Sequence, residues 1–158
     1  PGNPRGVPRW IGRGPGNPEG MPRWIRPRGR KGAELGLDTL LGIRVEEVSG
    51  DRVVAVCPVT PDLHQPYGLV HGGVYAALAE TAASYGAASW LADRGGTFGI
   101  SNHTDFLRPV REGTLRAEAT PLARGRTTQL WQVAISDDQD RLVAHGRVRL
   151  INLGDMPG

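Results

Sequence analysis

The stretch that decides the fold runs from His71 to Leu91 and reads HGGVYAALAETAASYGAASWL. As a helix it spans about 30 Å at 1.5 Å per residue. Two glycines stand near its start, and the polar, glycine-rich run 93–96 ends it. Most of its other side chains are Ala, Gly or Ser, so strands can approach it closely. The composition predicts one long central helix packed against a sheet.

Glu80 is the only ionisable residue between Val74 and Leu91 apart from two tyrosines. A surface helix normally carries several charges on its exposed face, so we expect most of this helix to be buried. A buried carboxylate is costly unless it is hydrogen-bonded or lines a cavity. We interpret Glu80 as a functional carboxylate. The alternative is that it occupies a narrow exposed stripe without a role.

Two further features share the helix face of Glu80. Ser84 lies one turn beyond it, and Gly73 lies two turns before it, at the start of the helix. The first turn of a helix presents free N–H groups and the positive end of the helix dipole. We expect the missing Cβ atoms of Gly72 and Gly73 to let a ligand carbonyl approach these donors. Donors for an oxyanion beside a carboxylate suit acyl transfer.

The segments around the helix alternate as strands do. We predict a short helix over 33–41, strands over 42–49 and 52–59 with a tight turn at 50–51, a proline-bracketed loop, and four strands over 97–108, 114–122, 128–136 and 141–151. In the last strand we expect Leu142, Ala144, Gly146, Val148 and Leu150 to face inward. Short links imply an antiparallel sheet that curls round the helix, an α+β fold of the hotdog type.

The N-terminal segment differs from the rest. PGNPRGVPRWI at 1–11 returns as PGNPEGMPRWI at 15–25, and residues 1–32 carry a charge of +7. The chain carries +3 overall, so residues 33–158 carry −4. We expect an extended or disordered tail over 1–32, a domain over 33–153 and a short tail over 154–158. The tail is either a basic arm for RNA or a partner, or a solvated extension upstream of a start at Met21.

Several classes of protein are excluded. A mildly acidic domain argues against nucleic-acid binding. The apolar run is mostly Ala and contains Glu80, which argues against a membrane span. Cys57 is the single cysteine, which fits a reducing, cytoplasmic location. His64, His71, Asp62 and His103 lack metal-ligand spacing, and the chain has no serine-hydrolase elbow or P-loop, so we expect no metal.

Three motifs resemble one known family. His64-Gln65-Pro66-Tyr67-Gly68-Leu69-Val70-His71-Gly72-Gly73, followed by Glu80 and Ser84, is similar to the hotdog acyl-CoA thioesterases of the hydroxybenzoyl-CoA thioesterase type. Residues 102–110, NHTDFLRPV, and 125–128, GRTT, match later strands of that family. The dihydroxynaphthoyl-CoA hydrolases belong to it, and the related phenylacetate-pathway enzymes carry Asp on this helix. The resemblance covers residues 34–152.

This resemblance implies a role for each matching residue. Glu80 is nucleophile or general base, and the family leaves both open. Gln65 orients the thioester or the water, and His71 hydrogen-bonds near the thioester. The Gly72 N–H polarises the thioester carbonyl, and Ser84 positions the water.

The resemblance also implies a homo-oligomer, a dimer or a dimer of dimers, with the active site at the subunit interface. We expect the residues that contact the CoA phosphates to lie at the mouth of the pocket. The candidates are Gly73, Arg108, Arg111, Gly125, Arg126 and Thr127. CoA enters as part of the substrate, and no other cofactor is expected.

The sequence therefore predicts hydrolysis of an aryl or related bulky acyl-CoA to free acid and CoA. The rival hypothesis is a non-catalytic acyl-CoA-binding sensor or partner-binding module on the same fold. A dehydratase on this fold would need an Asp–His pair, which we cannot place. Retention of Glu80, Gln65 and Ser84 together favours the enzyme, because binding alone needs no carboxylate beside a thioester.

Overall fold

The computed structural model describes residues 36–154. Its elements are α1 (Leu37–Leu41), β1 (Arg44–Val48), β2 (Val53–Pro58), η1 (Pro61–Leu63), β3 (His64–Gln65), β4 (Leu69–Val70), α2 (Gly72–Leu91), η2 (Ala92–Arg94), β5 (Gly96–Phe106), β6 (Thr114–Arg124), β7 (Thr128–Ser136) and β8 (Leu142–Leu153). The predicted tail over 1–32 lies outside the described residues, as does all but the first residue of the predicted tail over 154–158.

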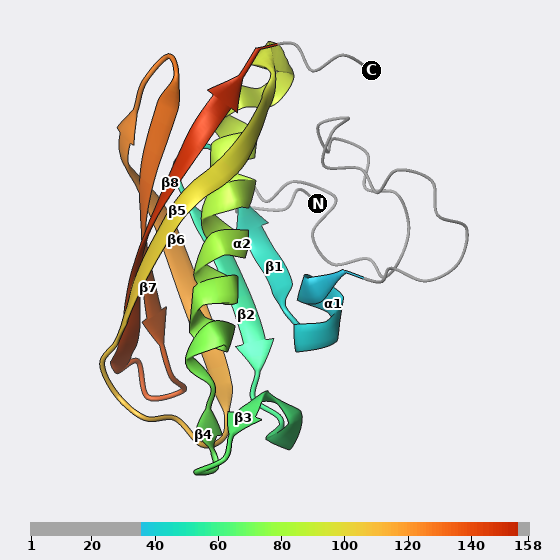
Figure 1. Cartoon of the computed structure of the whole chain (residues 1–158), viewed down its shortest axis with the longest axis vertical. Helices are drawn as coiled ribbons and strands as arrows, with labels where there is room; N and C mark the ends of the chain where they lie inside the picture. Colours follow the sequence, from blue (N-terminus) through green and yellow to red (C-terminus); the bar gives the residue numbers. More distant parts are fainter. Residues whose placement is uncertain (1–35, 155–158) are drawn as a thin grey trace, which may run out of the picture.

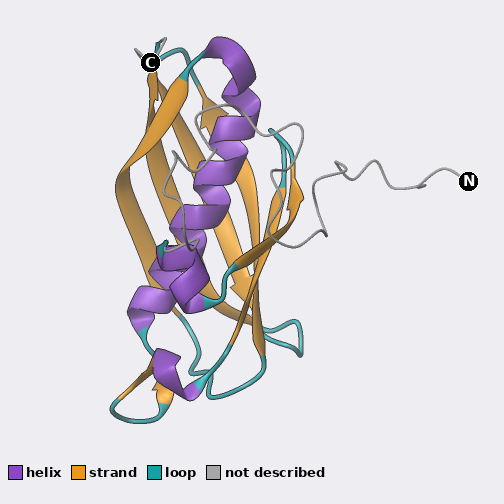
Figure 2. Cartoon of the chain, turned by 90° about the vertical axis from the view of Figure 1, so that its right-hand side faces the viewer, coloured by secondary structure: helices purple, strands orange, loops and turns teal. Residues whose placement is uncertain are grey.

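Six strands form one antiparallel sheet in the order β1-β2-β6-β7-β8-β5. Helix α2 runs along the length of this sheet (Figure 1) and lies against one of its faces (Figure 2). The short strands β3 and β4 form a separate pair just before α2. One long helix on one antiparallel sheet is the α+β hotdog arrangement that the sequence predicts. None of the described helices is long and apolar enough to cross a membrane.

Small residues on α2 permit close packing against the sheet. A Cβ on Gly86 would lie 2.5 Å from the ring of Trp131, so the indole occupies the space of that missing side chain. On β8, a Cβ on Gly146 would lie 3.0 Å from Ala79. Leu78 and Leu115 are fully buried between the two layers. This packing fixes which residues of α2 face the sheet and which remain on its other side.

Several predicted boundaries need correction. The described part of the first helix begins at Leu37, and the proline-bracketed loop contains η1 and the β3–β4 pair. Leu142, predicted to face inward, is 41% exposed, whereas Val143 is fully buried. The cause is an irregularity in the β7–β8 register, where Ile135 pairs with Ala144 but Ser136 pairs with Leu142. This shift breaks the alternation that the sequence pattern assumes.

Candidate active site

Glu80 lies half-buried on α2, and its carboxylate is held by a side chain of β5. The Asn102 Nδ2 group donates to Glu80 Oε2 at 2.9 Å and to the Ala76 carbonyl at 3.0 Å. The Thr104 hydroxyl donates to Asn102 Oδ1 at 2.7 Å, which fixes the amide with its N–H₂ group towards the carboxylate. Asn102 therefore orients Glu80, and Oε1 accepts no hydrogen bond within residues 36–154.

The backbone of β5 comes very close to this carboxylate at Gly99. A Cβ at Gly99 would lie only 1.8 Å from Glu80 Oε1. Real Cβ atoms do not approach an oxygen so closely, so the observed position of Glu80 requires glycine here. Gly99 and Asn102 together define where the carboxylate lies: one leaves it room, and the other binds it.

At the other end of this face, the start of α2 presents a free donor. His71 is the N-cap, and its Nδ1 accepts the Gly73 N–H at 2.9 Å. The Val74 N–H bonds to the His71 carbonyl at 2.9 Å. The Gly72 N–H has no partner within the described part of the chain. Because Nδ1 is an acceptor, a neutral His71 carries its proton on Nε2, where it is a second donor.

The missing Cβ atoms at the helix start leave room for two rings of the same chain. A Cβ on Gly72 would lie 2.5 Å from the Phe106 ring, and a Cβ on Gly73 would lie 3.0 Å from the His71 imidazole. The rings of Phe106 and His71 therefore occupy the space of the two missing side chains.

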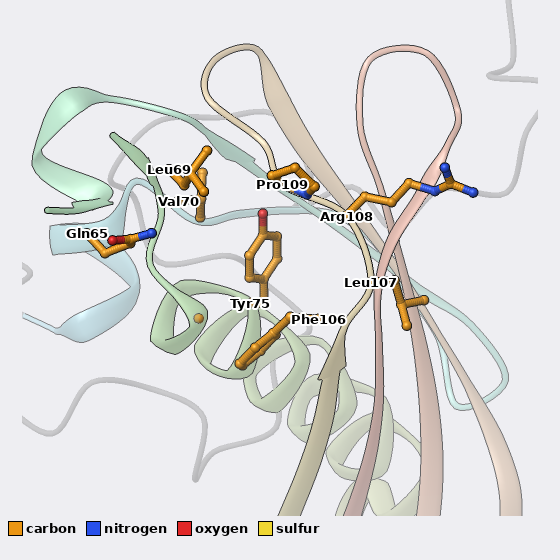
Figure 3. Close-up of a pocket in the computed structure, with 9 residues that line it drawn as sticks. Gln65, Leu69, Val70, Tyr75, Phe106, Leu107, Arg108 and Pro109 are labelled. Carbon is orange, nitrogen blue, oxygen red and sulfur yellow. The ribbon is translucent and has the colours of Figure 1, made fainter. Parts of the chain in front are cut away.

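A cavity of about 280 Å³ opens beside this donor (Figure 3). Its walls are mostly apolar, and it is lined by Gln65, Leu69, Val70, Gly72, Tyr75, Phe106, Leu107, Arg108 and Pro109. The Gln65 Oε1 atom accepts the Tyr67 N–H at 2.9 Å, so the Gln65 N–H₂ group remains as a donor. The cavity thus combines the Gly72 and Gln65 donors with mostly apolar walls, as small-molecule sites commonly do.

Within one protomer, Glu80 does not reach this cavity. Glu80 lies eight positions after Gly72 in α2, which corresponds to roughly 12 Å along the helix axis. Glu80 is also absent from the residues that line the cavity. Ser84 lies a further turn away and is half-buried. One chain therefore contains a carboxylate group and a donor group, but holds them apart.

The candidates for contact with CoA phosphates fall at opposite ends of the sheet. Arg108 lines the cavity, and its Nε donates to the Leu142 carbonyl at 3.2 Å. Arg111 lies nearby and donates to the Gly68 carbonyl at 3.1 Å. The turn containing Gly125, Arg126 and Thr127 lies beyond the far ends of β6 and β7.

A buried polar network holds that far turn in place. The fully buried Trp131 donates through Nε1 to Gln129 Oε1 at 3.0 Å, and Gln129 Nε2 donates to the Ala87 carbonyl at 3.2 Å. Gln129 Nε2 also donates to Asn152 Oδ1 at 2.8 Å, and Asn152 Nδ2 donates to the Gly125 carbonyl at 2.9 Å. The turn is therefore anchored to both the helix and β8.

Sequence reasoning assigned no role to Asn102, Thr104 or Gly99. A signal was present: these residues lie on the side of β5 that contacts α2, where a strand that only packs would carry apolar side chains. These polar residues can be recognised as unusual only once the structure shows which face of β5 contacts α2. The residues described in the structure contain no group of three His, Cys, Asp or Glu side chains arranged to hold a metal.

Comparisons with known proteins decide the family. The model of the thioesterase superfamily matches residues 67–144. The Mycobacterium tuberculosis protein Rv1847, whose name assigns it to the esterases, is 46% identical over 123 residues, covering 76% of this chain and 88% of that protein. The chain belongs to the thioesterase superfamily. This membership places it among the thioester-hydrolysing enzymes of the hotdog fold.

Two solved structures are similar to this chain in fold and sequence. The structure of Rv1847 has a TM-score of 0.74 and covers 76% of this chain and 98% of its own. AziG of S. sahachiroi is 47% identical, with a TM-score of 0.72, and the match covers 73% of this chain and 94% of AziG.

A further relative was found by sequence. The 1,4-dihydroxy-2-naphthoyl-CoA hydrolase of Listeria monocytogenes is 34% identical over 113 residues, covering 72% of this chain and 92% of that enzyme.

Proposed function

We propose that this thioesterase hydrolyses an aryl or related bulky acyl-CoA to the free acid and CoA, with Glu80 as its catalytic carboxylate. The observation that carries the proposal is the fixed position of Glu80. Asn102 holds one carboxylate oxygen at 2.9 Å, while the other oxygen accepts no hydrogen bond within residues 36–154. A carboxylate held in this way is suited to activate water or to attack a carbonyl carbon. The name of the Listeria relative supports a bulky aromatic acyl-CoA as the substrate class.

The site is complete only in a dimer, because Glu80 and the helix-start donors of one protomer are too far apart. Strand β5 is an edge of the sheet, since it pairs with β8 alone. It exposes Phe98, Ile100 and Phe106 by 54%, 54% and 57%. A long edge strand with unpaired backbone groups and exposed apolar side chains is a surface that pairs with another strand. We propose that β5 pairs antiparallel with β5 of a second copy.

This pairing joins the separated groups. In an antiparallel pair related by a two-fold axis near Asn102 and His103, Gly99 of one copy lies opposite Phe106 of the other. Gly99 lies beside Glu80, and Phe106 covers Gly72. The carboxylate of one protomer then approaches the donors of its partner. The turn 125–127 lies at the Gly96 end of β5 and likewise approaches the end of the partner that carries Arg108.

The chemistry then follows from the groups present. The Gly72 N–H and the Gln65 amide bind the thioester carbonyl oxygen and stabilise the negative charge that develops there. Glu80 of the partner either takes a proton from water, whose oxygen attacks the carbonyl carbon, or attacks that carbon itself. In the second case, water later cleaves the resulting anhydride. The C–S bond breaks, and the departing thiolate of CoA takes up a proton.

Ser84 is proposed to position the water, and His71 to donate through Nε2 near the thioester. Gly73, Arg108, Arg111, Gly125, Arg126 and Thr127 are proposed to contact the CoA moiety. The proposal needs no cofactor other than the CoA of the substrate. It also assigns the enzyme to the cytoplasm, where Cys57 stays reduced.

The test is Glu80→Gln, assayed by thiol release from benzoyl-CoA, hydroxybenzoyl-CoA, dihydroxynaphthoyl-CoA and straight-chain CoA esters. We expect kcat/KM to fall by about 10²–10⁴, the usual contribution of a catalytic base, while the thermal unfolding curve stays unchanged. Glu46→Gln, on the opposite edge strand β1, is the matched control and should retain activity. Full activity of Glu80→Gln would reject the proposal. Tight binding of one ester with hydrolysis of none would favour the sensor.

A mixing experiment tests the shared site. Glu80→Gln and Gln65→Ala are each expected to be inactive as homodimers. If the site spans two protomers, an exchanged equimolar mixture contains one intact site in each mixed dimer, so about a quarter of wild-type activity returns. If each protomer carries its own complete site, no activity returns.

A further inference from the structure

Tyr75 lies one turn into α2, and its hydroxyl is without a partner. The side chain is 3% exposed, and its ring packs against Phe106 with the ring centroids 5.7 Å apart. Of the buried side-chain nitrogen and oxygen atoms in residues 36–154, the Tyr75 hydroxyl oxygen is the one with no hydrogen bond. Most buried polar groups in native proteins are paired, so this exception calls for an explanation.

The packing alone does not require a hydroxyl here. Phe would fill the same space without an unpaired oxygen, because the rest of the ring contacts apolar neighbours. Burial raises the pKa of the Tyr75 phenol, and the nearby charge of Asp137 raises it further. The hydroxyl is therefore neutral at physiological pH and can both donate and accept a hydrogen bond. A partner from outside the chain is the simplest use for such a group.

Figure 3 shows Tyr75 in the middle of the side chains that line the cavity, with its hydroxyl directed towards Val70 and Pro109. The same cavity contains Gln65 and Gly72, which are proposed to bind the thioester carbonyl. A thioester held there places its acyl group a few ångströms from the donors, against the apolar walls. The volume of about 280 Å³ is at the small end for ligand sites, so a compact acyl group fits better than a long chain.

We infer that this cavity receives an aromatic acyl group bearing a ring oxygen, and that the Tyr75 hydroxyl hydrogen-bonds to that oxygen. The inference rests on the proposed function and adds a specificity-determining residue to it. The aromatic rings of Tyr75 and Phe106, tilted by 35°, provide faces and edges against which a third ring packs. A site that pairs a buried hydroxyl discriminates against analogues that leave it unpaired.

The test compares benzoyl-CoA with the hydroxybenzoyl-CoA isomers, using the full-length wild-type chain and Tyr75→Phe. We expect the wild type to prefer the best hydroxybenzoyl isomer by about tenfold in kcat/KM, the worth of one net hydrogen bond. Tyr75→Phe should lose this preference, with kcat/KM on the hydroxybenzoyl ester falling about tenfold relative to kcat/KM on benzoyl-CoA. Tyr85→Phe, a half-buried tyrosine of α2 that does not line the cavity, is the matched control and should keep the preference.

An equal fall in rate on all esters in Tyr75→Phe, or no change on any, would overturn the inference and leave the proposed function intact. If the wild type hydrolyses none of the esters, the proposed function fails instead. Binding then decides the inference separately, with phenacyl-CoA and hydroxyphenacyl-CoA, thioethers that cannot be hydrolysed. Titration calorimetry should show tighter binding of the hydroxylated probe to wild type and equal binding of both probes to Tyr75→Phe. Equal binding of both probes to wild type would overturn the inference.

Discussion

Gly99→Ala tests whether the position of the catalytic carboxylate depends on a close approach of backbone. The new Cβ would lie 1.8 Å from Glu80 Oε1. An ordinary carbon–oxygen contact is about 3.3 Å, so the carboxylate must move by about 1.5 Å. The clashing atom is the tip of a flexible side chain, so the movement costs about 0.5–1.5 kcal/mol of rotamer energy. The fold should therefore survive with little loss of stability.

The activity should not survive. A movement of this size breaks the 2.9 Å hydrogen bond from Asn102 and misplaces the reacting oxygen. Misplacement by about 1 Å commonly costs about 10²-fold in rate, so we expect a loss of at least that size in kcat. The assay is thiol release from the best CoA ester, alongside thermal unfolding. Gly154→Ala is the control, because a Cβ there meets no atom within 4 Å. A Gly99→Ala enzyme that retains kcat within about threefold of wild type would refute the reasoning.

Three further predictions concern Asn102, the β5 edge and Cys57. Asn102→Leu should lower kcat by about tenfold or more with little change in KM, because Glu80 loses its one side-chain donor. Restoration of kcat in Asn102→Gln would show that the donor matters. Unchanged kcat in Asn102→Leu would contradict this role. Ile100→Asp should be a monomer by light scattering and inactive by thiol release, because it places a charge on the proposed dimer edge. Leu122→Asp, on β6, is the control and should remain an active dimer. An active dimer of Ile100→Asp would contradict β5 pairing. Cys57 should resist thiol reagents at pH 8 until the chain unfolds, because burial raises the pKa of its thiol and its Sγ lies 3.3 Å from the Leu41 carbonyl oxygen. Rapid labelling of the native chain would disprove this.

The central helix and the succession of strands along the chain were predictable from local sequence patterns. The run of small residues over α2 and the clear alternation in β7 depend on neighbours along the chain, and both predictions are confirmed. Glu80 stood out because a charge inside such a run is unusual. Leu142 was misplaced because its orientation depends on the pairing register with β7, which no local pattern records.

The environment of Glu80 could not be predicted from the sequence. Asn102 and Gly99 lie 22 and 19 positions along the chain from it, and β5 folds back along α2 to bring them to the carboxylate. Which residues of β5 face the helix depends on the irregularity between Gly99 and Ser101, which shifts the alternation along the strand. The unpaired hydroxyl of Tyr75 was equally hidden, because a tyrosine in an apolar helix gives no sign of whether its oxygen finds a partner.

The sequence by itself determined the helix, the alternating strands and the residue types available for chemistry, because these follow from side-chain size, polarity and period along one segment. Tertiary structure alone decided which of those residues meet. It placed an amide against a carboxylate and gave the glycine next to it no room for a methyl group. It decided these contacts because packing sets the distances between segments far apart along the chain, whereas the roughly 12 Å between the carboxylate and the helix-start N–H donors follows from eight positions along one helix.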